Sequence, residues 1–319
     1  MSERLPTLEE IRAARERIAG TAVRTPLVRL GLAGAAADIY LKLENLQPIG
    51  SFKLRGATNA IARMTPAQLA RGVLTASAGN MAQGVAWRAR DLGISCTVIA
   101  PDTAPATKTQ AVERLGGRVI KVPFAEWWQT FERRAFPGID ATFIHAFDDP
   151  DVMAGNGTIA LEILEDLPDT EAIVIPWGGG GLACGIASGA RALKPGCRIY
   201  TAEAATAAPF AASFAAGSPQ TIEQRLSFID GIGSPTVFAG MFARARRVID
   251  GALVATVDAV AAAVRLLAER NRVIAEGAGA CPVACALGGG AGSGKIVCIV
   301  SGGNIDLDKL VGILGGATS

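Results

Sequence analysis

The sequence predicts an α/β fold in which parallel strands carry helices on both faces of the sheet. Strand-like apolar segments alternate with helix-like segments along nearly the whole chain, which is the pattern of repeated βαβ units. Glycine clusters directly follow several of these strands, at the positions where open α/β sheets bind ligands. At 319 residues the chain can hold one or two domains, and composition alone places no boundary.

The first helix is predicted to run from Thr7 to about Ala19, because Thr7-Leu8-Glu9-Glu10 has the form of a capping box. Short apolar runs predict strands at 38–43, 72–76, 95–100, 118–122, 172–176, 198–202 and 295–300. The segments between them predict helices at 56–64, 81–92, 106–115, 156–164, 182–193, 258–269 and 279–286.

The composition excludes several classes of protein. Half of the residues are hydrophobic and the net charge is only +2, so the chain is not intrinsically disordered. No apolar run reaches the roughly 18 residues of a membrane-spanning helix. The sequence also lacks the basic stripe that is typical of nucleic-acid-binding proteins. We therefore expect a small-molecule partner, with no membrane and no nucleic acid.

The cysteines predict a reducing location. None of them forms a CxxC pair, and several lie in apolar runs, so we expect buried thiols in a cytoplasmic protein. The first ten residues lack the apolar stretch of a signal peptide, which agrees with this location. A zinc site at Cys281 and Cys285 would lack further ligands, because the chain has one histidine. The six cysteines are at positions 96, 184, 197, 281, 285 and 298.

The tetraglycine loop Gly178–Gly181 stands between a predicted strand and a predicted helix. Its successive N–H groups, next to the positive end of the helix dipole, suit a phosphate dianion. A simple turn is the alternative, although four glycines would lose much conformational entropy there. The pattern Gly178-x-Gly180-x-x-Ala183, with Glu203 ending the next strand, also leaves a nicotinamide dinucleotide open.

Two further glycine clusters flank the last predicted strand. The segment Gly289–Lys295 looks like a P-loop, but Ile296 replaces the magnesium-binding Ser or Thr, and the segment precedes a strand. We therefore expect a surface loop there. Ser301-Gly302-Gly303-Asn304 follows the strand, where Ser301 can present its hydroxyl to a ligand.

Lys53 follows Gly50-Ser51-Phe52 at the start of a predicted helix. The positive end of the helix dipole disfavours an ammonium group, and an apolar site would lower the pKa of the amine further. Such an amine can act as a base or as the nucleophile of Schiff-base chemistry. A solvated surface lysine is the alternative.

The stretch from Lys42 to Ala57, KLENLQPIGSFKLRGA, resembles the active-site lysine motif of the fold-type II pyridoxal-phosphate enzymes. It is closest to the branch of threonine/serine dehydratases and serine racemases. Further motifs of that family have similar counterparts here in the same order, over essentially the whole chain. They are Thr25-Pro26-Leu27, Ser77-Ala78-Gly79-Asn80, the tetraglycine loop with Leu182, Asp230-Gly231-Ile232, Glu276-Gly277-Ala278-Gly279-Ala280 and Ser301–Asn304.

The resemblance implies two open, twisted, parallel-rich α/β domains with the cofactor between them. The large cofactor domain would comprise residues 1–68 and 148–319, and the small domain 69–147 would be inserted into it. The family's usual state, a homodimer, is implied in the same way.

The resemblance also assigns roles to residues around pyridoxal 5'-phosphate. Lys53 would hold the cofactor as a Schiff base, Asn80 would hydrogen-bond the phenolic oxygen of its ring, and Ser301 would face the pyridine nitrogen. The implied cofactor contacts are Phe52, Lys53, Asn80, Gly178, Gly179, Gly180, Gly181, Leu182 and Ser301. The implied substrate contacts are Ser51, Ser77, Ala78, Gly79, Asn80, Met81 and Phe124, with Lys53 and Ser77 as the catalytic residues.

The implied reaction is the α,β-elimination of water from a 3-hydroxy-L-amino acid, which gives a 2-oxo acid and ammonia. Lys53 would remove the Cα proton, and the cofactor would supply the electron sink. A hydroxyl partner such as Ser301 does not force protonation of the ring nitrogen, which favours elimination over transamination. A racemase of the same fold, a nicotinamide-dependent oxidoreductase and a catalytically silent binding protein are the alternatives.

Some positions depart from the family pattern. Met81 stands where these dehydratases usually have histidine, so the site should be more apolar there. Ala78 lacks the hydroxyl of the racemases, so racemisation should be weak. Glu203 and Ala207 match the racemase metal site, but Pro209 replaces a carboxylate ligand. The remaining ligands are too few for magnesium or calcium, and we expect no metal.

The aromatic residues Phe124, Trp127 and Trp128 leave two interpretations open. They can form the core side of an amphipathic helix, or Phe124, which follows a strand end, can reach the substrate. Together with Met81, the second interpretation favours a bulky β-substituent, as in phenylserine, over threonine or serine. His145 is the only histidine, and we expect it to have a structural role.

Overall fold

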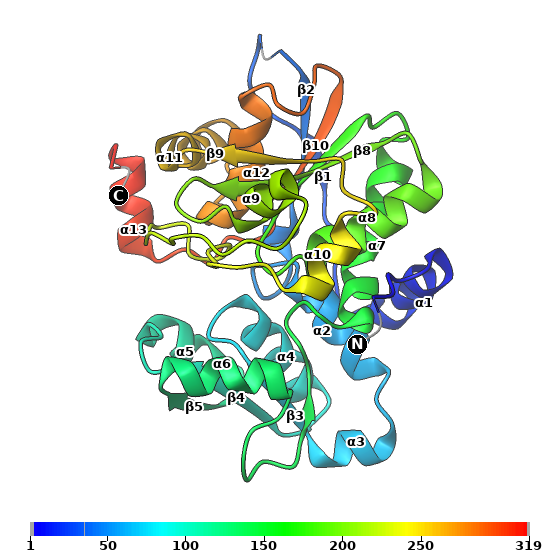
Figure 1. Ribbon diagram of the computed structural model, residues 1–319, viewed down its shortest axis with the longest axis vertical. Coiled ribbons are helices and arrows are strands. Elements are labelled where there is room, and N and C mark those ends of the chain that lie inside the picture. The colour runs from blue at the N-terminus through cyan, green and yellow to red at the C-terminus, as the bar shows by residue number, and fades with distance from the viewer. Residues whose placement is uncertain (1–2, 35, 318–319) are drawn as a thin grey trace.

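The computed structural model describes residues 3–34 and 36–317, and it confirms the predicted fold class. Two parallel-rich sheets lie in separate regions of the molecule, each with helices packed against it (Figure 1). The first two residues of the N-terminal segment interpreted above lie outside the described residues.

The larger sheet has six strands in the order β1-β2-β10-β7-β8-β9, all parallel except β1, which pairs antiparallel with β2. Alternate residues of its strands face opposite sides. On β10, Ile296 and Cys298 join one apolar cluster, whereas Val297 and Ile299 join the other. The strands are β1 (Leu27–Arg29), β2 (Asp38–Lys42), β7 (Ala172–Pro176), β8 (Arg198–Ala204), β9 (Gly251–Ala255) and β10 (Lys295–Ile299).

Helices bury both faces of this sheet, as a parallel sheet requires. One face packs against α11 (Val257–Leu266), α12 (Gly277–Leu287) and α13 (Leu307–Leu314). The other packs against α7 (Pro150–Asp166), α8 (Gly181–Leu193), α9 (Pro209–Ala216) and α10 (Ala239–Ala245). The remaining helical segments here are α1 (Leu8–Ile18), which packs on α7, a 3-10 turn at Glu44–Leu46 and a π-helical turn at Leu267–Asn271.

The smaller sheet has four parallel strands in the order β5-β4-β3-β6. They are β3 (Val73–Ala76), β4 (Cys96–Pro101), β5 (Arg118–Val122) and β6 (Thr142–Phe143). The associated helices are α2 (Lys53–Ala62), α3 (Pro66–Arg71), α4 (Asn80–Asp91), α5 (Ala106–Arg114) and α6 (Phe124–Arg133). All four strands fall within the segment 69–147, whose assignment as a domain stays a prediction.

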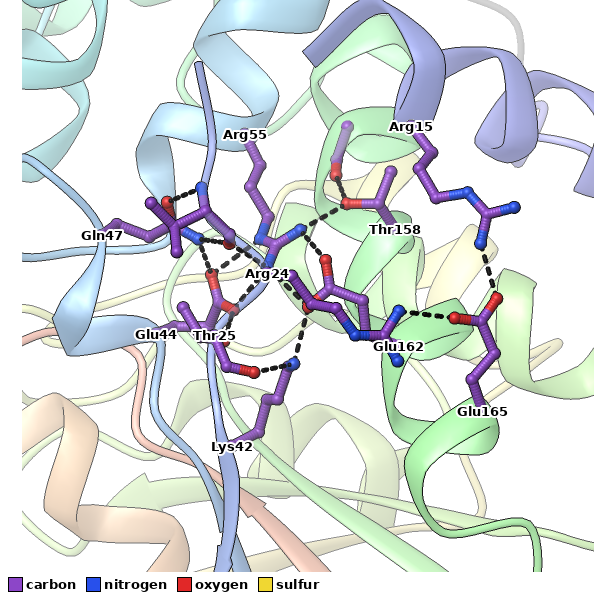
Figure 2. Close-up of polar contacts among 12 residues, drawn as sticks. Arg15, Arg24, Thr25, Lys42, Glu44, Gln47, Arg55, Thr158, Glu162 and Glu165 are labelled. Carbon is purple, nitrogen blue, oxygen red and sulfur yellow. Dashed lines mark hydrogen bonds and ion pairs between the residues drawn. The ribbon is translucent and has the colours of Figure 1, made fainter. Parts of the chain in front are cut away.

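A buried ionic cluster fixes α2 to its neighbours (Figure 2). Arg55, on α2, contacts the carboxylates of Glu44 at 2.8 Å and of Glu162, on α7, at 2.6 Å. Lys42, at the end of β2, contacts Glu162 at 2.6 Å. Two cations and two carboxylates balance one another, and all four side chains are almost fully buried. Burial opposes ionisation of Glu44, but Arg55 and the hydrogen bonds around the carboxylate hold its pKa below the usual value.

Helix α2 begins at Lys53, as expected from the lysine motif, although the helical pattern itself was recognised only from residue 56. The preceding turn is held in place, because Phe52 N donates to Ser301 O at 3.0 Å. The predicted start of α7 was wrong. Helix α7 begins at Pro150 rather than at residue 156. Asp149 caps it by accepting hydrogen bonds from the N–H groups of Asp151 and Val152.

Three strands that the sequence did not predict, β1, β6 and β9, lie at the edges of their sheets. Edge strands keep one side open to solvent, so their apolar patterns are weak; β9, for example, is mostly half-buried or exposed. Helices α3, α9, α10 and α13 were also not predicted, and each has eight residues or fewer.

All six cysteines are buried and free, as predicted. No helix in residues 3–34 and 36–317 has the length and apolar character needed to cross a membrane.

Candidate active site

A cavity of about 610 Å³ is lined by residues from the regions of both sheets. Strand ends supply much of its wall: Ser77 follows β3, Gly178 comes shortly after β7, and Ser301 comes shortly after β10. The carboxyl ends of parallel strands thus converge here, where α/β folds bind ligands.

Lys53 lies in this cavity at the first turn of α2. Its Nζ donates to Ala146 O at 2.8 Å and stands 5.2 Å from the centroid of the Phe52 ring. Burial lowers the pKa of Lys53 to about 8, although the carboxylate of Glu276 opposes this shift. At pH 7, about a tenth of this amine is therefore unprotonated, far more than for an ordinary lysine, and able to act as nucleophile or base.

The tetraglycine loop forms another part of the wall, and its shape depends on the absence of side chains. A Cβ on Gly179 would lie 2.2 Å from the Phe147 ring, and one on Gly180 would lie 2.5 Å from the Trp177 ring. Gly180 also has φ +88° and caps the start of α8. Within residues 3–34 and 36–317, no protein acceptor takes the N–H groups of Gly178, Gly179 or Gly180. This cradle of open donors at a helix start fits the phosphate of the cofactor expected from the sequence.

The loop from Ser77 to Met81, like the tetraglycine loop, has backbone N–H groups without a protein acceptor. Gly79 N donates to Ser77 Oγ at 3.2 Å, so the Ser77 hydroxyl orients its own loop. In the part of the chain that the structure describes, the N–H groups of Ala78, Asn80 and Met81 donate to no protein acceptor. They remain available to an anionic group in the cavity, such as the carboxylate that the sequence led us to expect.

Asn80, the first residue of α4, connects the loops of the cavity. Its Nδ2 donates to Glu276 at 2.9 Å, and its Oδ1 accepts from Asn304 Nδ2 at 2.7 Å. Burial and the negative charge of Asp230 raise the pKa of Glu276 to about 7, against the opposing effects of Lys108 and of the Asn80 hydrogen bond. The cavity therefore holds a carboxyl group that titrates near neutrality.

The remaining predicted contacts divide into two groups. Phe52, Leu182 and Ser301 line the cavity. Ser51 does not: it is fully buried behind the wall, and it pairs through its backbone with Gly302. The structure therefore gives Ser51 the role of holding the Lys53 turn against the Ser301 loop, rather than a direct contact with substrate.

One side of the cavity is an aromatic wall built by α6, which we define as Phe124, Trp127, Trp128 and Phe131. The core interpretation of Phe124 was wrong, because 56% of its surface is exposed. The wall continues across the cavity: the Trp128 ring lies 5.4 Å from that of Phe238. Met81 lines the same cavity and is 2% exposed.

Glu203 lies outside the cavity lining and is fully buried. Its carboxylate accepts hydrogen bonds from the N–H groups of Phe210 and Ala211, at the start of α9. Burial raises its pKa to about 7. This carboxylate is therefore occupied as a helix cap and cannot reach a nucleotide ribose. Among the described residues, no group of three His, Cys, Asp or Glu side chains could hold a metal ion.

His145 is buried, and its Nδ1 accepts hydrogen bonds from the N–H groups of Phe147 and Asp148. Burial and the positive charge of Arg134 lower its pKa to about 3, so it stays neutral. These bonds orient the segment whose Ala146 carbonyl receives Lys53, which is a structural role.

Sequence reasoning named neither Glu276 nor Asn304 as a site residue, although both stand in motifs that it quoted. Their side chains meet Asn80 only after residues about 200 positions apart come together. Phe147 and Phe238 also line the cavity, and no local pattern around them indicates that position.

Comparisons with known proteins agree on one family. The model of a family described as "pyridoxal-phosphate dependent enzyme" matches residues 18–302. The L-threonine ammonia-lyase of Thermotoga maritima is 38% identical over 95% of this chain and 77% of its own. The catabolic L-threonine dehydratase TdcB of Staphylococcus aureus is 35% identical over 97% and 92% of the two chains. The solved structure of maize serine racemase has a TM-score of 0.91 at 33% identity, over 97% of this chain and 96% of that one.

Proposed function

The chain belongs to the pyridoxal-phosphate dependent enzymes, and from this premise we propose that it dehydrates 3-hydroxy-L-amino acids with a bulky or aromatic β-substituent. Its cofactor is pyridoxal 5'-phosphate, and the relatives named as threonine ammonia-lyase and dehydratase support a carbon–nitrogen lyase. In the overall reaction, water leaves across Cα and Cβ and is taken up again when ammonia is released. The product is a 2-oxo acid.

The bound cofactor supplies an electron sink for negative charge at Cα. The residues of the chain do the rest. Lys53, with its lowered pKa, holds the cofactor and moves the Cα proton. The open N–H groups of the tetraglycine loop bind the phosphate, and those of Ala78 and Asn80 bind the substrate carboxylate. The aromatic wall gives one side of the cavity an apolar surface.

The aromatic wall is the observation that carries the proposed substrate class. Phe124 and Trp127 line the same cavity as Lys53, and Met81 supplies a further apolar surface without a hydrogen-bond donor. The two rings lie 5.3 Å apart and are tilted by 45°, an arrangement that a third ring can extend. A phenyl substituent gains apolar and aromatic contacts here that a methyl group or a hydrogen cannot make.

A substrate panel tests this proposal. L-serine, L-threonine and L-threo- and erythro-phenylserine are scored for release of 2-oxo acid and ammonia. We expect kcat/KM for one phenylserine isomer to exceed that for threonine at least tenfold, and Phe124→Ala to reduce this ratio about tenfold. Phe214→Ala, a change in a partly buried ring outside the cavity, is the matched control. Equal preference for threonine and phenylserine in the wild type would refute the substrate class.

The racemase interpretation has less support, although serine racemases are among the similar structures. Ala78 lines the cavity with a methyl group, and racemisation needs a proton donor on the side of Cα away from Lys53. We therefore propose that elimination greatly outpaces racemisation, which a chiral assay of the residual substrate measures.

We further propose a cytoplasmic homodimer. The six buried, unpaired thiols support a reducing compartment. Helix α13 exposes Leu307 (75%), Val311 (68%) and Leu314 (46%) on one face, a stripe of the kind that a second subunit covers. We expect sedimentation at twice the chain mass and a shift toward monomer in Val311→Arg, but not in Leu92→Arg. A monomer at micromolar concentration would contradict the dimer.

A further inference from the structure

Three side chains in the cavity form a hydrogen-bonded series that we call the amide relay: Asn304, Asn80 and Glu276. Asn304 Nδ2 donates to Asn80 Oδ1 at 2.7 Å and to the main-chain oxygen of Ile49 at 2.9 Å. Asn80 Nδ2 then donates to Glu276 Oε1 at 2.9 Å. The relay thus joins the first residue of α4 to the loops that precede α2, α12 and α13.

The main-chain oxygen at Ile49 sets the direction of the whole relay, because a carbonyl can only accept. Asn304 must therefore turn its nitrogen toward Ile49, and its second N–H meets Asn80. Asn80 must accept this hydrogen bond with its oxygen, so its own nitrogen donates to Glu276. A carboxamide nitrogen carries two hydrogens, so one N–H of Asn80 stays free for a group in the cavity that Asn80 lines.

Two glycines keep room for the relay. A Cβ on Gly302 would lie 2.6 Å from Glu276 Oε1, and one on Gly50 would lie 2.6 Å from Asn304 Oδ1. Glu276 is also tied through its backbone, since its N–H donates to Gly302 O at 3.0 Å. The backbone at Gly302 and at Gly50 therefore holds the two ends of the relay, Glu276 and Asn304, in place.

We propose that Asn304 and Glu276 are positioning residues that fix the Asn80 carboxamide so that one Nδ2–H serves an anionic oxygen of the bound cofactor. This inference rests on the proposed function, because it needs pyridoxal 5'-phosphate in the cavity. A donor at such an oxygen stabilises its deprotonated form. Without the relay, Asn80 could turn its own oxygen toward the cofactor and repel it.

Asn304→Asp tests the proposal most sharply, because an ionised carboxylate cannot donate to Asn80 and forces the carboxamide to turn over. The visible absorption band of the bound cofactor is titrated with pH in the holoenzyme. We expect its midpoint to move upward by about one pH unit, since an oxygen that loses its donor holds a proton more tightly. The cofactor dissociation constant should rise about tenfold. Asn304→Ala, which removes the donor without adding charge, should shift the midpoint less.

Asn45→Asp is the matched control. Asn45 also donates from Nδ2 to a main-chain oxygen, that of Ile274 at 3.0 Å, but it touches neither Asn80 nor the cavity. Its titration should match the wild type. Asn80→Ala supplies the full effect, and adding Asn304→Asp to it should change nothing further, because Asn304 acts through Asn80.

The possible outcomes separate the two proposals. If the wild type has no visible band that borohydride bleaches, or if the band survives in Lys53→Ala, the proposed function fails. If the wild type has the band but both Asn304 variants titrate like it, the amide relay is refuted. Equal shifts in Asn45→Asp and Asn304→Asp, or additive shifts with Asn80→Ala, would refute it as well.

Discussion

Lys53 and Arg55 stand two positions apart on α2 and therefore serve opposite faces of the helix. Lys53 lies in the cavity, whereas Arg55 lies in the buried ionic cluster (Figure 2). The cluster holds the helix in place, and the cavity lowers the pKa of the amine. Within one turn of α2, Lys53 thus supplies the reactive amine and Arg55 anchors the helix.

The lowered pKa of Lys53 gives a pH prediction. Only the neutral amine can attack the cofactor, so the rate at which cofactor-free protein captures it should rise about tenfold per pH unit below 8 and level off above. Glu276→Gln should move this midpoint downward, because the Glu276 carboxylate raises the pKa of Lys53. Stopped-flow absorbance follows the reaction. A midpoint near 10.5, the ordinary value for lysine, would show that the site does not tune the amine.

Individual residues also mark the limit of what the sequence could predict. Lys53, Asn80 and the tetraglycine loop stand in local motifs, and the cavity brings them together as expected. Glu276 gains its raised pKa only from burial and from charges brought near by folding. Ser51 lies beside the key lysine in sequence, yet its side chain lies outside the cavity lining. Spacing along the chain indicates which loop is used, but not which way a side chain turns.

At the scale of elements, α7 carries two glutamates in contrasting surroundings. Glu162 is buried between Lys42 and Arg55, whereas Glu165 pairs with Arg15 and Arg24 with 47% of its side chain exposed. Glu162→Gln leaves buried cations without their counter-charge and should lower the free energy of unfolding by about 3–5 kcal/mol. Glu165→Gln should lower it by at most about 1 kcal/mol.

Urea unfolding followed by circular dichroism measures both variants. The midpoint should fall at an unchanged slope. Equal losses of unfolding free energy in the two variants would show that the buried cluster contributes no more to stability than the exposed ion pairs of Glu165.

Burial accounts for most of the accuracy of the predicted strands, although the edge strand β5, which is largely open to solvent, was also predicted correctly at 118–122. Central strands such as β7 and β10 were predicted within a residue, because continuous apolar runs are needed where both faces are covered. The edge strands β1, β6 and β9 were missed, since solvent on one side relaxes that need. Helix α2 begins at Lys53, as the lysine motif indicated, although its apolar pattern is recognisable only from residue 56.

For the whole molecule, cofactor binding should couple the regions of the two sheets, because both line one cavity. A ligand at about 100 times its dissociation constant stabilises the native state by about 2.7 kcal/mol. We therefore expect pyridoxal 5'-phosphate to raise the melting temperature by several degrees. Pyridoxal, which lacks the phosphate, should raise it far less because it leaves the tetraglycine loop empty. Equal stabilisation by both compounds would argue against the phosphate cradle.

Helix α6 supplies the aromatic wall from a single stretch of ten residues, whereas the lysine, the glycine loop and the amide relay come from the rest of the chain. The proposed selectivity therefore depends mainly on α6, whereas the proposed chemistry depends on other parts of the chain. Changes confined to this one helix could therefore alter the range of amino-acid substrates while the proposed catalytic residues stay in place. For the same reason, a library in which only α6 is randomised should yield variants with altered substrate preference and an unchanged lysine, glycine loop and amide relay.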